Sequence, residues 1–343
     1  MPRTDTLLSA LPRAKLLSQP TPLERLDRLS EELGLDLWIK RDDLTGLSFG
    51  GNKTRQLEFY IGAALAAGAD TILITGAVQS NFARTAAAAA SKYGMQAILQ
   101  REERVPGMDP LYYSSGNVFL SDILGAESMS YPEGEDEAGA DAALEARAEE
   151  LRAAGRIPYI IPLGLGHPPL GALGYVQGGA ELAAQIGGFD AAVVPSGSGA
   201  THGGFLTGVR LAGITSPVFG ICVRRDAQAQ KVRLEKVTAE LAGLMNIPQP
   251  FPGGDILTWD GALAPGYGRA GCATCKALQR MAAAEGILLD PVYSAKTFAG
   301  LLGLLEEGAI GKGQKVLLLH TGGLPALFAY QNALGFGSGG AAR

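Results

Sequence analysis

A lysine that follows two glycines is the first residue of this 343-residue sequence that could carry chemistry. In the run Ser48-Phe49-Gly50-Gly51-Asn52-Lys53, the glycines allow a tight turn, and Lys53 stands at the start of a predicted helix over residues 52–67. A lysine at such a position can be held in a cleft, as a Schiff-base lysine must be. Most lysines are solvated surface groups, so this segment alone does not identify a catalytic residue.

A second candidate site is the run Gly76-Ala77-Val78-Gln79-Ser80-Asn81, between a predicted strand over 71–75 and a predicted helix over 81–94. Hydroxyl and amide groups beside free backbone N–H groups suit a substrate carboxylate or a cofactor hydroxylate. Ser80 or Asn81 could equally be an N-cap that only stabilises the helix. The sequence leaves these two interpretations open.

The run Ser196-Gly197-Ser198-Gly199-Ala200-Thr201 follows a predicted strand over 191–194 and predicts a phosphate site. Small residues let successive N–H groups converge on a phosphate, and the helix N-terminus adds its dipole. His202 stands where a dinucleotide-binding motif has its third glycine, and the GK[ST] ending of a P-loop is missing. The pattern therefore indicates a phosphate but not a pyrophosphate.

Three further loops carry candidate polar groups. They are Pro265-Gly266-Tyr267-Gly268, Asp290-Pro291-Val292-Tyr293 and His320-Thr321-Gly322-Gly323. Tyrosines in such loops can act as acids or bases, although packing or structural hydrogen bonds are the commoner role. A threonine directly after a strand, here predicted over 315–320, stands where α/β sheets bind ligands.

Short apolar runs alternate with helical segments from Leu37 onward, which predicts an α/β fold with largely parallel sheets flanked by helices. Gly and Pro residues interrupt the pattern at 164–169, where we expect the chain to cross between two domains. We predict a larger domain of residues 1–53 and 166–343 and a smaller α/β domain of residues 54–165. The active site is expected in the cleft between them.

Composition excludes several classes of function. The net charge of −5 and the isoelectric point near 5.4 give no basic excess, so neither nucleic acid nor an anionic membrane surface is an expected partner. No secretory or membrane-spanning segment is recognisable, and we expect a cytoplasmic protein. Cys222, Cys272 and Cys275 are expected to be buried and inert, with no metal site. The acidic residues Glu133, Glu135, Asp136, Glu137 and Asp141 are expected in the solvated start of a helix.

Taken in order, GGNK, QSN, SGSGAT, PGYG, DPVYS and HTGG resemble the pyridoxal-phosphate (PLP) enzymes of the tryptophan-synthase-β fold type. More narrowly, they resemble the branch with D-cysteine desulfhydrase, 1-aminocyclopropane-1-carboxylate (ACC) deaminase and L-cysteate sulfo-lyase. The resemblance extends from about Leu17 to Leu334. It implies that the larger domain binds PLP, that the substrate is a small amino acid and that the protein is a homodimer.

The same resemblance implies roles for individual residues. Lys53 would be the Schiff-base lysine, Asn81 would contact the 3′-oxygen of PLP, and Thr321 would face the pyridine nitrogen. A hydroxyl there does not keep the ring protonated as a carboxylate would, which favours elimination over transamination. The phosphate would lie on Ser196, Gly197, Ser198, Gly199, Ala200 and Thr201. The substrate would contact Gln79, Ser80, Asn81, Tyr267 and Tyr293, and Ser80 and the two tyrosines are the further catalytic candidates.

The predicted reaction is elimination from D-cysteine to pyruvate, ammonium and sulfide, with L-cysteate, which would release sulfite, as the alternative. Ser294 argues against ACC ring opening, because the deaminases of this branch carry glutamate there, and the run Phe82-Ala83-Arg84-Thr85 departs from the branch. Arg84, Arg101 and Arg104 are candidates to bind a sulfonate.

Two rival functions come from other classes. Arg224-Arg225 beside the Gly197 turn would suit an NADP-dependent oxidoreductase, although His202 counts against it. A non-catalytic amino-acid-binding module would not need Lys53. The proton acceptor for Cα stays open: Lys53 is favoured, with Ser80 or a tyrosine as the alternative for a D-amino acid.

Overall fold

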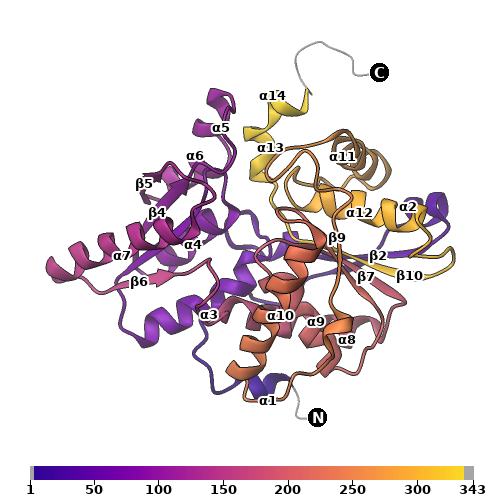
Figure 1. Ribbon diagram of the computed structural model, residues 1–343, viewed down its shortest axis with the longest axis horizontal. Helices are drawn as coiled ribbons and strands as arrows, with labels where there is room; N and C mark the ends of the chain where they lie inside the picture. The colour runs from indigo at the N-terminus through magenta and orange to yellow at the C-terminus, as the bar shows by residue number, and fades with distance from the viewer. Residues whose placement is uncertain (1–3, 336–343) are drawn as a thin grey trace.

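The computed structural model describes residues 4–335, which contain two separate sheets (Figure 1). The six-stranded sheet has the order β1-β2-β10-β7-β8-β9, and only β1 is antiparallel to its neighbour. Its strands are β1 (Leu23–Arg25), β2 (Asp36–Arg41), β7 (Ala191–Ser196), β8 (Val218–Cys222), β9 (Leu257–Trp259) and β10 (Lys315–His320). This sheet extends across the right half of the view in Figure 1.

The four-stranded sheet is parallel throughout and has the order β5-β4-β3-β6. Its strands are β3 (Thr71–Ala77), β4 (Gln96–Glu102), β5 (Glu127–Tyr131) and β6 (Pro158–Ile161). All four lie within residues 54–165, and the strands of the larger sheet lie outside that range. The domain boundaries at 53/54 and 165/166 stay a prediction.

Helices cover both faces of the sheets, as parallel sheets require. They are α1 (Thr4–Leu8), α2 (Asp27–Leu33), α3 (Lys53–Ala66), α4 (Asn81–Lys92), α5 (Pro110–Ser114), α6 (Asn117–Ile123), α7 (Glu137–Ala153), α8 (Leu170–Ile186), α9 (Ala200–Leu211), α10 (Ala227–Leu244), α11 (Cys272–Glu285), α12 (Ser294–Glu306), α13 (Pro325–Ala329) and α14 (Gln331–Leu334). Short 3-10 turns span Asp42–Leu44, Leu47–Phe49 and Gly253–Asp255. The central strand β7 is buried along its whole length.

Strand register brings the predicted site loops to one edge of the larger sheet. His320 pairs with Arg41, so the chain leaves β10 at Thr321 beside the point where β2 ends. The phosphate-loop candidate follows β7, which pairs with β10 in parallel. Carboxyl ends of parallel strands meet at the same edge, where α/β sheets bind ligands.

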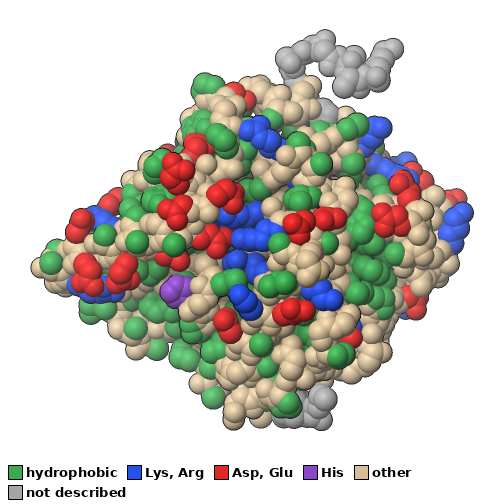
Figure 2. Space-filling view, viewed as in Figure 1, with side chains coloured by type: hydrophobic (Ala, Val, Ile, Leu, Met, Phe, Trp, Pro, Cys, Tyr) green, Lys and Arg blue, Asp and Glu red, His purple; other side chains and the backbone are tan. Residues whose placement is uncertain are grey.

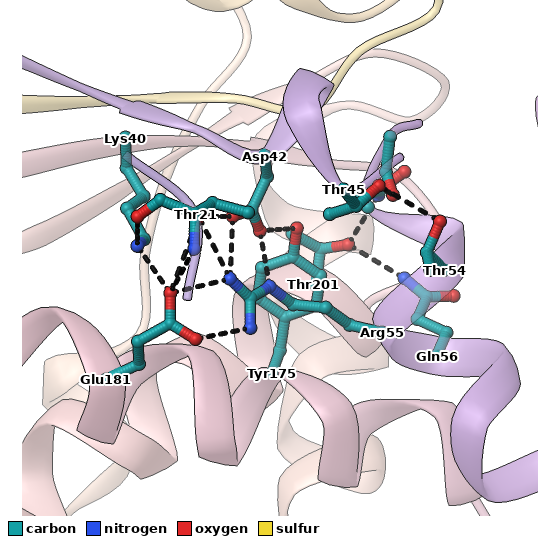
Figure 3. Close-up of polar contacts among 12 residues, drawn as sticks. Thr21, Lys40, Asp42, Thr45, Thr54, Arg55, Gln56, Tyr175, Glu181 and Thr201 are labelled. Carbon is teal, nitrogen blue, oxygen red and sulfur yellow. Dashed lines mark hydrogen bonds and ion pairs between the residues drawn. The ribbon is translucent and has the colours of Figure 1, made fainter. Parts of the chain in front are cut away.

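The first turn of α3 is fixed by a buried network of charged side chains (Figure 3). Arg55 donates to both carboxylate oxygens of Asp42, at 2.8 and 2.9 Å, and it also pairs with Glu181. Lys40 donates to Glu181 and Tyr175 donates to Asp42. Burial raises the pKa of the Asp42 carboxyl, but the Arg55 guanidinium outweighs it and holds the pKa below its usual value. Two cations therefore balance two carboxylates directly behind Lys53.

Among the described helices, none has the length and apolar character needed to cross a membrane.

Candidate active site

A cleft of about 930 Å³, counting space open to solvent, brings together loops from both sheets. Ten predicted site residues line it: Lys53, Ser80, Asn81, Gly197, Ser198, Gly199, Thr201, Tyr267, Tyr293 and Thr321. Blue Lys and Arg side chains gather in the middle of the face shown in Figure 2, between α7 and α10 as labelled in Figure 1.

Lys53 is the first residue of α3 and points into this cleft. Gly51 has φ +106°, and a Cβ there would meet the Thr321 carbonyl oxygen at 3.1 Å, so the turn needs glycine. The Lys53 ammonium lies 4.8 Å from the centre of the Phe82 ring and 3.3 Å from the Gln56 side-chain oxygen. Burial lowers the pKa of Lys53 to about 8. A larger fraction of neutral amine is therefore available for nucleophilic attack than in a surface lysine.

The loop before α9 has the features of a phosphate cradle. Gly199 has φ +102°, a backbone conformation that favours glycine. A Cβ at this position would also come within 3.2 Å of the Val237 side chain. The first N–H groups of a helix have no partner within it and point outward, toward an anion. The Thr201 hydroxyl accepts from the amides of Asn52 and Gln56, each at 2.9 Å, so its own proton is free to be donated. These residues fit the phosphate of PLP.

The start of α4 supplies polar groups on the opposite wall. The Ser80 hydroxyl caps the helix by accepting from Ala83 N at 3.1 Å, so the N-cap interpretation is confirmed while the side chain also lines the cleft. The Asn81 side-chain oxygen accepts from Asn117 at 2.9 Å, which leaves the Asn81 amide hydrogens available as donors. An acceptor such as the 3′-oxygen of PLP fits these donors.

The two tyrosines meet in the wall of the cleft. The hydroxyls of Tyr267 and Tyr293 are 2.7 Å apart, and the ring centres are separated by 6.2 Å in an edge-to-face arrangement. Burial, together with the neighbouring Tyr267, raises the pKa of Tyr293 well above its usual value. Tyr293 is therefore a neutral proton donor near neutral pH.

Sequence analysis missed a cluster of opposite charges in the cleft wall. Glu137 pairs with Arg224 and Arg225 at 3.1 and 2.7 Å, and Arg233 lies 3.6 Å from it. Burial raises the pKa of Glu137, but the guanidiniums, Arg233 first, outweigh it and hold that pKa below its usual value. Glu137, whose side chain is 31% exposed, is therefore only partly solvated, because α7 places it against arginines that no local pattern connects to it. Glu133, Glu135 and Asp136 are exposed as expected.

The polar side-chain atoms of Gln79 and Ser196, both predicted site residues, are bonded within the protein. Gln79 donates to the carbonyls of Tyr112 and Ser115 and accepts from Asn117 N. Ser196 bonds His202 and Gln230 behind the phosphate loop. Neither residue lines the cleft, and Ala200 lines a neighbouring pocket instead. The side chains of Gln79 and Ser196 thus support the site from behind, whereas the backbone N–H of Ala200 is the first of α9 and belongs to the phosphate cradle.

The structure also places the arginines and cysteines singled out in the sequence. Of the three sulfonate-binding candidates, Arg104 lines the cleft, Arg101 pairs with Asp122 outside it, and Arg84 is buried against the backbone carbonyl of Ser48. Cys222 is buried as expected, but Cys272 is exposed, because α11 begins at the surface. Within residues 4–335, no group of three or more His, Cys, Asp or Glu side chains could hold a metal ion.

Comparison with known proteins identifies the family. Residues 15–322 match the family model described as pyridoxal-phosphate dependent enzyme, and the chain belongs to this family. It is 39% identical over 326 residues to the D-cysteine desulfhydrases of Salmonella choleraesuis (strain SC-B67) and Salmonella paratyphi C (strain RKS4594), covering 94% of this chain and 97% of each relative. The predicted PLP cofactor is confirmed.

Solved structures confirm the fold class. The crystal structure of an ACC deaminase homologue, 36% identical, superposes with a TM-score of 0.87 over 97% of this chain and 98% of that one. O-ureido-L-serine synthase, 18% identical, has a TM-score of 0.66 over 98% of this chain and 96% of its own, and shares the fold. The oxidoreductase alternative is excluded by this family membership, and Arg224 and Arg225 are engaged with Glu137.

Proposed function

We propose that the protein catalyses α,β-elimination from D-cysteine, giving pyruvate, ammonium and sulfide. The observation that carries this proposal is the match to D-cysteine desulfhydrases over nearly the full length of both chains. The position of Lys53 in the cleft supports it, because an amino-acid-binding module would not need an amine with a lowered pKa there.

Each wall of the cleft has a proposed task. Ser198 and Thr201 would hold the PLP phosphate, Asn81 would donate to the 3′-oxygen, and Thr321 would face the pyridine nitrogen as a neutral partner. Lys53 is the covalent attachment point. When bound, PLP stabilises the negative charge that develops on Cα as its proton leaves.

The substrate lies between Ser80 and the tyrosine pair in this proposal. Ser80 and the N–H groups at the start of α4 hold the substrate carboxylate. Lys53 takes the proton from Cα, with Ser80 or Tyr267 in that role if a D-amino acid presents its other face, since Tyr293 stays protonated. The Cβ–S bond then breaks and its electrons leave with sulfur as hydrosulfide. Hydrolysis of the remaining three-carbon unit yields pyruvate and ammonium.

L-cysteate is the second candidate substrate, and the arginines of the cleft favour it. Arg104 and Arg224 line the cleft on the side of the tyrosines, and the Arg224 guanidinium lies 6.0 Å from the Tyr267 ring centre. Guanidinium groups suit a sulfonate, which would leave as sulfite. A sulfonate would have to share these cations with the carboxylates they already pair with, Glu102 for Arg104 and Glu137 for Arg224. ACC is disfavoured, because the buried Ser294 hydroxyl bonds Asp290 at 2.7 Å and does not line the cleft.

A cytoplasmic homodimer is also part of the proposal. Large apolar side chains are exposed on and near α6, where Phe119 is 56% and Ile123 65% accessible one turn apart. Such side chains support a contact with a second copy of the chain. Sedimentation of the purified protein checks this: a monomer at micromolar concentration would contradict it.

Side-by-side kinetics on D-cysteine, L-cysteate and ACC test the proposal, with pyruvate, sulfide and sulfite measured separately. We expect the highest kcat/KM for D-cysteine. A preference for L-cysteate that is lost in Arg224→Met would reverse the order of the first two candidates. A preference for ACC would contradict elimination as the main activity.

A further inference from the structure

A buried lysine of α12 contacts the loop that carries Tyr267. Lys296 lies in the first turn of α12 with no accessible surface, and it does not line the cleft. Its ammonium donates to the carbonyls of Leu263 and Gly266, both at 2.8 Å. Gly266 N also donates to the Leu263 carbonyl at 2.9 Å, so the two acceptors are the ends of one turn, and Tyr267 is the next residue.

Among residues 4–335, no carboxylate lies within hydrogen-bond distance of the Lys296 ammonium. Asp290 acts on it only through space, because the Asp290 oxygens accept from the backbone N–H groups of residues 292–294 and from the Ser294 hydroxyl. An ammonium buried against neutral carbonyls loses much of its hydration without a compensating ion pair. An apolar side chain of similar size would fill the same space without that penalty. Packing alone therefore does not explain the Lys296 ammonium, whose hydrogen bonds to the loop are the remaining reason for a lysine here.

The segment from Asp290 to Lys296 controls both tyrosines. Asp290 accepts from Tyr293 N at 3.0 Å and fixes the turn in which Tyr293 precedes α12. Lys296 follows Tyr293 by three residues and lies in the first turn of α12. Its ammonium fixes the loop residues 263–266, which directly precede Tyr267. The contact of 2.7 Å between the two hydroxyls joins side chains that come from these two turns. A shift of either turn would break that contact.

We infer that Lys296 is a positioning residue that sets the contact between Tyr267 and Tyr293 by clamping the turn at residues 263–266. The inference rests on the proposed function, in which these tyrosines face the substrate. Lys296 touches neither substrate nor PLP. It acts through the backbone of the Tyr267 loop.

A double-mutant cycle in the PLP-loaded enzyme tests this inference. Lys296→Met removes the donors and keeps the bulk, and we expect kcat for D-cysteine to fall roughly 10- to 100-fold while the PLP dissociation constant changes less than about twofold. Tyr267→Phe should lower kcat by a similar factor. The kcat of the double variant should lie within about twofold of that of the slower single variant, because both substitutions remove the same contact between Tyr267 and Tyr293. Lys276→Met, at an exposed position of α11, is the matched control and should keep full activity.

A readout independent of turnover keeps the two proposals separable. Amide hydrogen exchange over residues 263–268 should become faster in Lys296→Met, while exchange over residues 197–201 stays unchanged. Losses of kcat that multiply in the double variant would overturn the inference, and so would unchanged exchange over 263–268. If the unaltered enzyme makes no pyruvate from D-cysteine, the proposed function fails, but the exchange measurement still decides whether Lys296 clamps the loop.

Discussion

Lys53 and Lys296 have the same lowered pKa, about 8, in two different surroundings. Burial is the main cause at both positions, and Asp290 partly offsets it at Lys296. The Lys53 amine has one acceptor at 3.3 Å and faces the cleft, whereas the Lys296 amine donates to two carbonyls at 2.8 Å and is closed off. A low pKa thus makes a lysine reactive only where its amine is also accessible and free to move.

The largest effect is expected from removing the accessible amine. Lys53→Ala should lower kcat by more than about 10³-fold, because covalent attachment and proton transfer are both lost. Some PLP should still bind through the phosphate loop, which is a separate segment, and equilibrium dialysis would detect it. Lys92→Ala, at the exposed end of α4, is the control. Near-normal pyruvate production by Lys53→Ala would show that Lys53 is not the catalytic lysine.

The next effect concerns the network that fixes the start of α3. Arg55→Met leaves Asp42 buried without its cation, and we expect the free energy of unfolding to fall by about 3–5 kcal/mol. Urea denaturation of the PLP-free protein measures this. Arg152→Met, which removes exposed ion pairs of α7, should leave the midpoint unchanged. Equal effects of the two substitutions would mean that the buried network does not hold α3.

A smaller effect is expected in the chemical reactivity of Lys53 compared with that of Lys296. With a pKa of about 8, roughly one tenth of the Lys53 side chains are neutral at pH 7, far more than for a surface lysine. In the PLP-free protein, reductive methylation of Lys53 should accelerate about tenfold from pH 7 toward pH 9 and then level off. Lys296 should stay unlabelled over this range despite its similar pKa, as peptide mass spectrometry can verify. Equal labelling of both lysines would remove the distinction drawn between them.

The smallest effect is expected at Ser80, which has both a structural and a proposed substrate-binding role. Ser80→Ala should lower the free energy of unfolding by about 1 kcal/mol through loss of the helix cap. It should also raise KM roughly tenfold if the hydroxyl binds the substrate carboxylate. Ser91→Ala, at the exposed end of the same helix, is the matched control. A loss of stability with unchanged KM would mean that Ser80 only caps α4 and does not bind the substrate.

The sequence predicts the strands that precede the site loops, and most of these loops, because apolar runs and glycine turns are local signals. It does not predict β1, β4, β5, β6 or β9. The strand over 315–320 agrees with β10 at both ends, and Thr321 follows it into the cleft. Gln79 and Ser196 show the limit, since a motif does not reveal which way a side chain turns or which partner takes its hydrogen bonds. Glu137 and Arg233 were missed because their contact joins segments far apart in the chain.

The central claim is that Lys53 carries PLP. Borohydride reduction of the purified holoenzyme, followed by peptide mapping, tests it most directly, because reduction makes the link between PLP and its lysine permanent. We predict that the visible absorption band disappears and that the pyridoxyl group is found on the peptide containing Lys53. Its presence on the peptide containing Lys296, or on any other lysine, would contradict the account.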